Sequence, residues 1–189
     1  MTKARDLANG GFGLVLIKPS SVVNGTDNGK GTVSFSAQSS VTLNNIFTST
    51  YDNYQINITV TNTSTDLDLR MRVMDGLSAQ TGNFYNWAMP GLRISGTEWN
   101  QYGTSTSFYV NSCESASQPF NNSTIMCYSP LLEKNTTFNF LGGGVTQAGT
   151  VYGQAGIGIY GQDVSIEGLQ FLTSTGNMTG TVSVYGYNK

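Results

Sequence analysis

The chain has 189 residues and a formal net charge of −2, and only 11% of its residues are charged. Hydrophobic residues make up 38%, which is too many for a disordered chain, and the length suffices for one domain with a sizeable core. The nine Lys and Arg residues are scattered and histidine is absent. We therefore expect no nucleic-acid partner and no enzyme, because the first needs a basic patch and the usual nucleophilic triads need histidine.

The first twenty residues predict an extended N-terminal arm that precedes the folded domain. A glycine-rich run, Gly10 to Gly13, leads into an apolar run that ends at Ile17. An apolar run in an arm favours docking, either on the domain's own sheet or on a neighbouring protein. The expected attachment residues are Phe12, Leu14, Leu16 and Ile17. The run is too short for a signal peptide, and no segment approaches the length of a membrane-spanning helix, so we expect no membrane insertion.

Residues 21–189 predict a single all-β domain. Apolar and polar residues alternate over 54–60 and again over 67–73, and shorter alternations include Phe138 with Phe140 and Ile157 with Ile159. This pattern is typical of antiparallel strands with one buried face. The polar stretch 62–66 predicts a hairpin loop between two of them. About nine to eleven short strands are expected, which favours an antiparallel two-sheet sandwich, jelly-roll-like in topology.

Residues 76–125 look least regular, and we expect irregular, aromatic-rich loops there. Loops of a β-scaffold often carry its binding surface, and aromatic rings can stack on sugars. The alternative, which we favour, is that most of these rings lie in the core or in subunit interfaces. The candidate glycan or interface aromatics are Tyr85, Trp87, Trp99, Tyr102 and Tyr109.

Few other features suggest chemistry. Cys113 and Cys127 are the only cysteines, and they form either one disulfide or, as we favour, two free thiols. Glycines 142–144 lack the Lys-Ser/Thr ending of a phosphate-binding loop and predict a flexible loop. Without histidine the usual metal sites are missing, so neither a metal nor a cofactor is expected. Distant carboxylates could still meet in the fold and form a glycosidase pair.

Several stretches taken in order carry a family resemblance. They are 15–23 (VLIKPSSVV), 33–36 (VSFS), 41–54 (VTLNNIFTSTYDNY), 69–72 (LRMR) and 180–188 (GTVSVYGYN). Together they resemble virion structural proteins of tailed bacteriophages, particularly of marine and cyanobacterial phages. Relatives often carry Tyr-Asp-Gly-Phe in the penultimate strand, where this chain has Ile166-Glu167-Gly168-Leu169. The resemblance is strongest near 15–72 and 165–188.

The resemblance implies a non-enzymatic protein on the surface of the virion, synthesised in the host cytoplasm and bound to other virion proteins. We expect a capsid decoration or cement protein, because the chain lacks a fibre shaft and repeated weak contacts suit a shell. The alternative is a tail-fibre or adhesin subunit that recognises host surface glycans. A homotrimer is expected in either case.

Overall fold

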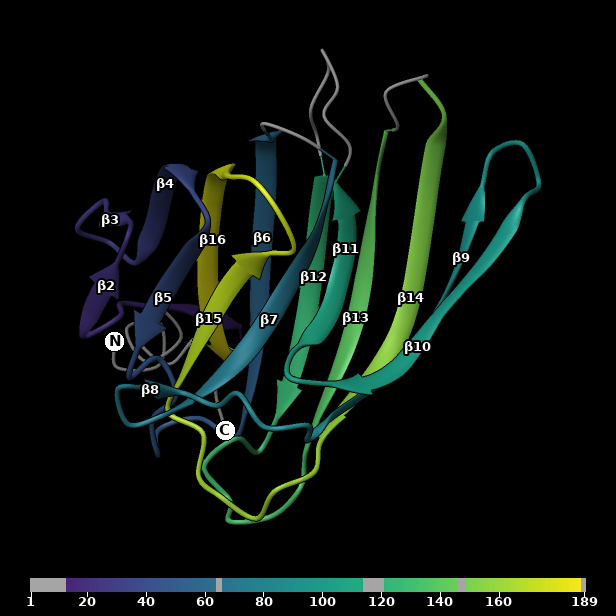
Figure 1. Ribbon diagram of the computed structural model, residues 1–189. Coiled ribbons are helices and arrows are strands. Elements are labelled where there is room, and N and C mark those ends of the chain that lie inside the picture. The colour runs from purple at the N-terminus through teal and green to yellow at the C-terminus, as the bar shows by residue number, and fades with distance from the viewer. Residues whose placement is uncertain (1–12, 64–65, 114–120, 146–148, 188–189) are drawn as a thin grey trace, which may run out of the picture.

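The computed structural model describes residues 13–63, 66–113, 121–145 and 149–187. Their regular structure is entirely β, in 16 strands that form two antiparallel sheets packed face to face (Figure 1). The predicted two-sheet sandwich is confirmed, with more strands than the nine to eleven expected. Within the described ranges, no helix is long and apolar enough to cross a membrane.

The larger sheet, sheet A, has ten strands. In spatial order it contains β10 (Glu98–Ser105), β9 (Tyr85–Arg93), β14 (Val151–Tyr160), β13 (Thr136–Val145), β12 (Asn121–Tyr128), β6 (Asn53–Thr63), β16 (Met178–Tyr187), β4 (Thr32–Gln38) and β3 (Thr26–Asp27). The tenth strand, β1 (Leu14–Ile17), pairs with the last four residues of β16, and β4 pairs with the preceding part of that strand. Strands β1 and β4 therefore share one edge of β16, end to end.

The smaller sheet, sheet B, has six strands and covers part of sheet A. In spatial order it contains β11 (Phe108–Cys113), β7 (Leu67–Asp75), β15 (Gly168–Thr173), β5 (Ser40–Asn44) and β2 (Ser21–Val23), while β8 (Ser78–Ala79) pairs with β7. Strands β6 and β7 lie in different sheets, so the segment between them crosses the sandwich, and the predicted hairpin loop is wrong. The crossing lets both apolar rows face the same core, whereas a hairpin would place them side by side.

The core is built around a cluster of aromatic rings. The ring centroid of Phe108, on β11, lies 4.9 Å from that of Tyr85, 5.1 Å from that of Phe138 and 5.6 Å from that of Phe140. All four side chains are buried. A Cβ atom at Gly158 would lie 2.7 Å from the Phe108 ring, so β14 needs a glycine where it passes this cluster.

The described part of the N-terminal arm docks on its own sheet. Strand β1 pairs with β16, and it buries Ile17 while Leu14 and Val15 remain 43% and 37% exposed. Leu16 is partly buried. Phe12 lies outside the described residues, and contact of this arm with a virion protein stays a prediction.

Both cysteines are free thiols, as the sequence favoured. Cys113 lies at the end of β11 and Cys127 in β12, and each side chain is fully buried. Burial raises the pKa of Cys113 to about 12 and that of Cys127 well above its ordinary value. Neither thiol is expected to be reactive in the native protein, because the thiolate is the reacting species.

Thiol titration tests this arrangement directly. The native protein at pH 8 is expected to give almost no reaction with an aromatic disulfide reagent, because both sulfur atoms lack solvent contact. Unfolding in denaturant without a reductant should release two reactive thiols per chain. A count of zero after unfolding would reveal a disulfide and would contradict the structure.

Candidate functional site

The segment predicted as irregular loops is mostly strand, which corrects that expectation. It contains β9, β10, β11 and the first residues of β12, and β9 pairs with both β10 and β14. The alternation in this region is interrupted by Pro90, Gly91 and Gly103, which obscures the strand signal. Long backbone ladders with neighbouring strands hold these residues in the sheet.

Two tryptophans fill the space above the glycines of the β9–β10 hairpin. Trp99 lies opposite Gly91, where an added Cβ would come within 2.3 Å of the indole. Trp87 lies opposite Gly103 in the same way, with its ring 3.3 Å from the position of the added Cβ. An aromatic ring over a cross-strand glycine supplies the packing that the glycine lacks.

The five candidate aromatics do not form one surface. Tyr85 is fully buried and donates to the carbonyl of Gln80 at 2.7 Å. Trp87 is partly buried against the core. Tyr102 is 78% exposed and lies on the face of β10 opposite to Trp99. Only Trp99 and Tyr109 line a common cavity. The favoured alternative, that these rings mostly serve packing, holds for Tyr85, Trp87 and Tyr109, of which Tyr109 is only 4% exposed and belongs to the core cluster.

That cavity is a cleft between the β9–β10 hairpin and the edge strand β11 of sheet B. Its volume is about 250 Å³. The guanidinium of Arg93 lies 5.8 Å from the Trp99 ring centroid, and the Tyr152 ring meets the indole edge-on, also at 5.8 Å. The hydroxyl of Tyr152 donates to the carbonyl of Ser112. The cleft is lined by Asp68, Arg93, Trp99, Gln101, Tyr109, Ser112 and Tyr152.

The charged groups of the cleft are held in place. Arg70 donates to a carboxylate oxygen of Asp68 at 3.0 Å, and both side chains are about one-third exposed. Burial, reinforced by the negative charge of Asp68, raises the pKa of Tyr109 well above its ordinary value, so this phenol stays neutral. In the described part of the chain, no three His, Cys, Asp or Glu side chains are grouped to hold a metal ion.

A buried polar network lies behind the cleft. The amide of Gln154 donates to the carbonyl of Val110 at 2.8 Å and to Asn111 at 3.1 Å, and Asn111 donates to the carbonyl of Gly143 at 3.3 Å. The hydroxyl of Tyr109 lies 3.5 Å from the carbonyl oxygen of the Gln154 side chain. The interior of the sandwich is therefore polar at this end, which fixes the strands that border the cleft.

A second feature is the outer face of sheet A, which points away from sheet B. From β4 across to β10, Glu98 is the single charged side chain on this face among the described residues. Over β16, β6 and β12 the face carries hydroxyl and amide groups, such as Thr59 donating to Asn122 at 2.8 Å. Over β13, β14 and β9 it carries exposed aliphatic side chains, including Leu141, Ile157 and Ile159.

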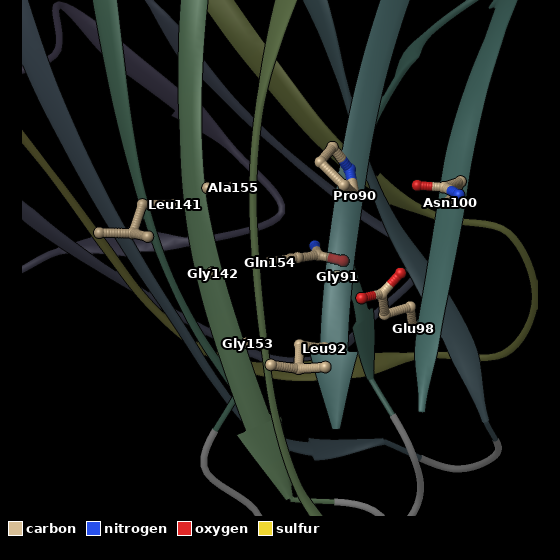
Figure 2. Close-up of a pocket in the computed structure, with 10 residues that line it drawn as sticks. All are labelled: Pro90, Gly91, Leu92, Glu98, Asn100, Leu141, Gly142, Gly153, Gln154 and Ala155. Atoms are coloured by element: carbon tan, nitrogen blue, oxygen red, sulfur yellow. The ribbon is translucent and has the colours of Figure 1, made fainter. Parts of the chain in front are cut away.

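A groove of about 530 Å³ runs along the aliphatic half of this face (Figure 2). Gly153 and Ala155 of β14 contribute little side-chain bulk between Leu141 of β13 and Leu92 of β9, which are 62% and 53% exposed. Glu98 and Asn100 of β10 lie at the polar end of the same groove. The sequence did not predict this groove, because small residues at alternate strand positions are weak strand signals and do not point to a surface feature.

Comparison with known proteins gives no family assignment. No family model matches the chain, and no curated protein matches it. Among solved structures, a protein of unknown function from Shewanella oneidensis MR-1 aligns with a TM-score of 0.36 and 9% identity, over 93% of this chain and 79% of that one. The SPRY domain of human HERC1 aligns with a TM-score of 0.33 and 9% identity, over 84% of this chain and 98% of that one.

Proposed function

We propose that this chain is a non-enzymatic structural protein on the surface of a bacteriophage particle, where it acts as a capsid decoration or cement protein. The observation that carries the proposal is the outer face of sheet A, which is broad and almost free of charge. The resemblance of residues 15–72 and 165–188 to virion structural proteins supports the same assignment. Attachment would place this face against the protein shell.

The chemistry of the face specifies the kind of partner. A charged partner group would lose its water against a neutral face without gaining an opposite charge, which costs free energy. The partner surface must therefore be neutral as well, as a protein shell can be, and unlike nucleic acid or an anionic membrane. The polar side chains of the face are already ordered by mutual hydrogen bonds, such as Thr124 to Asn57 at 3.2 Å. Repetition over a shell turns weak contacts into stable binding.

The cleft supports a binding role in preference to catalysis. Glycoside hydrolysis in its usual form needs two carboxyl groups on either side of the scissile bond. Asp68 is the one carboxylate among the described residues that line the cleft, and Arg70 already occupies one of its oxygens. Tyr109 stays neutral because burial raises its pKa.

The stoichiometry of purified particles tests the proposal. A decoration protein should be present in a fixed ratio to the major shell protein, visible on a stained gel and as repeated density on the capsid. A few copies confined to the tail would contradict it. Light scattering on the purified chain separately tests the proposed homotrimer.

Charges placed on the aliphatic half of the outer face of sheet A should weaken attachment strongly. The double variant Leu141→Lys with Ile157→Lys introduces two ammonium groups that would be desolvated against the shell, and we expect at least a tenfold loss of binding. The measurement is co-sedimentation with particles assembled without this protein. Leu77→Lys is the matched control, because Leu77 is 73% exposed and lies next to β8 of sheet B. Co-sedimentation of the double variant at the wild-type level would rule out this face.

The second candidate is a tail-fibre or adhesin subunit. The observation that favours it is the cleft, where Trp99 and Tyr109 meet polar side chains. Low copy number at the tail, together with loss of host attachment in particles that lack the protein, would support this function over decoration.

A further inference from the structure

The cleft between the β9–β10 hairpin and β11 combines an aromatic ring with polar groups that can bind hydroxyls. We propose that it binds one pyranose unit of a neutral saccharide. The site lies on the opposite side of the hairpin from the groove, because Trp99 and Gln101 alternate along β10 with Glu98 and Asn100. The proposal therefore goes beyond shell attachment and does not depend on it.

The size of the cleft restricts the ligand. Sites for drug-sized molecules usually enclose 300–1,000 Å³, whereas this cleft encloses about 250 Å³. A single sugar ring is a ligand of the matching class, and further units of a chain would extend into solvent.

Trp99 supplies a preorganised stacking surface. The indole packs over Gly91, Arg93 lies 5.8 Å from its ring centroid and Tyr152 contacts it edge-on. The side chain nevertheless remains partly exposed. A ring that is already fixed loses little conformational entropy when a ligand packs against it.

The polar groups around the indole match the hydroxyls of a sugar. Asp68 accepts hydrogen bonds, and its ion pair with Arg70 holds the carboxylate in position. The amide of Gln101 can donate and accept, and within the described residues its side chain has no hydrogen-bond partner. Arg70 offsets the charge of Asp68, whereas Arg93 adds one positive charge to the lining of the cleft. The choice of a neutral ligand with several hydroxyls therefore rests on the hydrogen-bonding groups of Asp68 and Gln101 and not on the charge of the cleft.

Calorimetric titration of the full chain tests the proposal. The probes are the methyl pyranosides of glucose, galactose, mannose, rhamnose and N-acetylglucosamine, with methyl glucuronide as the acidic comparison. We expect saturable binding of at least one neutral probe in the millimolar range. The Trp87→Phe variant leaves Trp99 as the only indole, so the same probe should change its fluorescence. No binding across the neutral probes, or binding of the glucuronide alone, would overturn the proposal.

Variants locate the binding. Asp68→Asn should weaken the Kd about tenfold, which is about the loss of one hydrogen bond to a charged group, and Gln101→Ala should weaken it about fivefold, which is about the loss of one neutral hydrogen bond. Trp99→Ala should abolish measurable binding. If Trp99→Ala also disturbs the hairpin, Gln101→Ala still tests the site, because Gln101 is exposed and its truncation should leave the fold intact. Tyr102→Ala is the matched control on the opposite face of the same strand and should bind as the wild type does. Loss of binding in Tyr102→Ala with retention in Gln101→Ala would place the sugar elsewhere and overturn the assignment.

Discussion

Replacing Phe108 with alanine is expected to lower the free energy of unfolding by about 3–5 kcal/mol, the cost of truncating a buried aromatic side chain. The ring has no solvent exposure, and from β11 of sheet B it contacts Tyr85, Phe138 and Phe140, which all belong to sheet A. The neighbouring rings cannot collapse into the space, because long strand ladders hold their backbones. Denaturant unfolding followed by circular dichroism measures the loss.

Leu141→Ala provides the control for this prediction. Leu141 is 62% exposed on the outer face of sheet A, so its truncation should change the free energy of unfolding by no more than about 0.5 kcal/mol. A loss below about 1 kcal/mol for Phe108→Ala would show that the cluster is not the centre of the core.

Stability is expected to fall steeply as the pH rises above about 9. Burial raises the pKa of Cys113 from 9.0 to about 12 and raises the pKa of Tyr85 and Tyr109 well above 10.0. Cys127, Tyr54 and Tyr160 shift in the same direction for the same reason. In the unfolded chain these groups lose their protons from about pH 9 upward, whereas in the folded protein they keep them.

The sign of the effect follows from proton binding. Above about pH 9 the unfolded state binds fewer protons than the native state, so stability decreases by up to about 1.4 kcal/mol per pH unit for each such group. Below the unfolded pKa values these groups contribute their full stability. Since native domains have only about 5–15 kcal/mol in total, several groups acting together should unfold the protein before pH 12.

Chemical denaturation at intervals between pH 8 and pH 11 measures this slope. Cys113→Ala removes one of the titrating groups. The free energy of unfolding of this variant should therefore fall less steeply with pH, by the contribution of about one proton. Constant stability across this range would mean that the thiols and phenols are more accessible to water than the structure shows.

The fold was predictable where the strands alternate regularly. Ile56 and Ile58 are buried as expected, and so are Leu69 and Met71. Glycines misled the interpretation elsewhere: residues 142–144 belong to strand β13, where neighbouring strands supply the hydrogen bonds that hold the backbone extended. The intrinsic strand propensity of a residue does not report which strands will pair with it.

Alternation also does not tell which face is buried. Ile157 and Ile159 form the expected row on β14, but they are 45% and 40% exposed, while Tyr152, Gln154 and Tyr160 point into the sandwich. The aromatic cluster occupies the space that larger aliphatic side chains would need, and Gly158 accommodates it. The exposed aliphatic row that results is part of the proposed attachment face.

The cleft was predictable only in part. Trp99 and Tyr109 were candidates because aromatic rings in a polar segment suggest sugar binding. Arg93 is close in sequence, but Asp68 and Tyr152 come from strands that only the sheet register brings to the hairpin. No local signal in the sequence reports such long-range pairing.

The Trp–Gly pairs of the β9–β10 hairpin have a practical consequence. Each indole covers a glycine of the partner strand and so stabilises the ribbon locally, and the turn at Ser95 and Gly96 is exposed. A foreign epitope spliced between these two residues would lengthen the ribbon outward without altering the register of the core strands. If the proposed decoration role holds, this turn is an insertion point for multivalent antigen display.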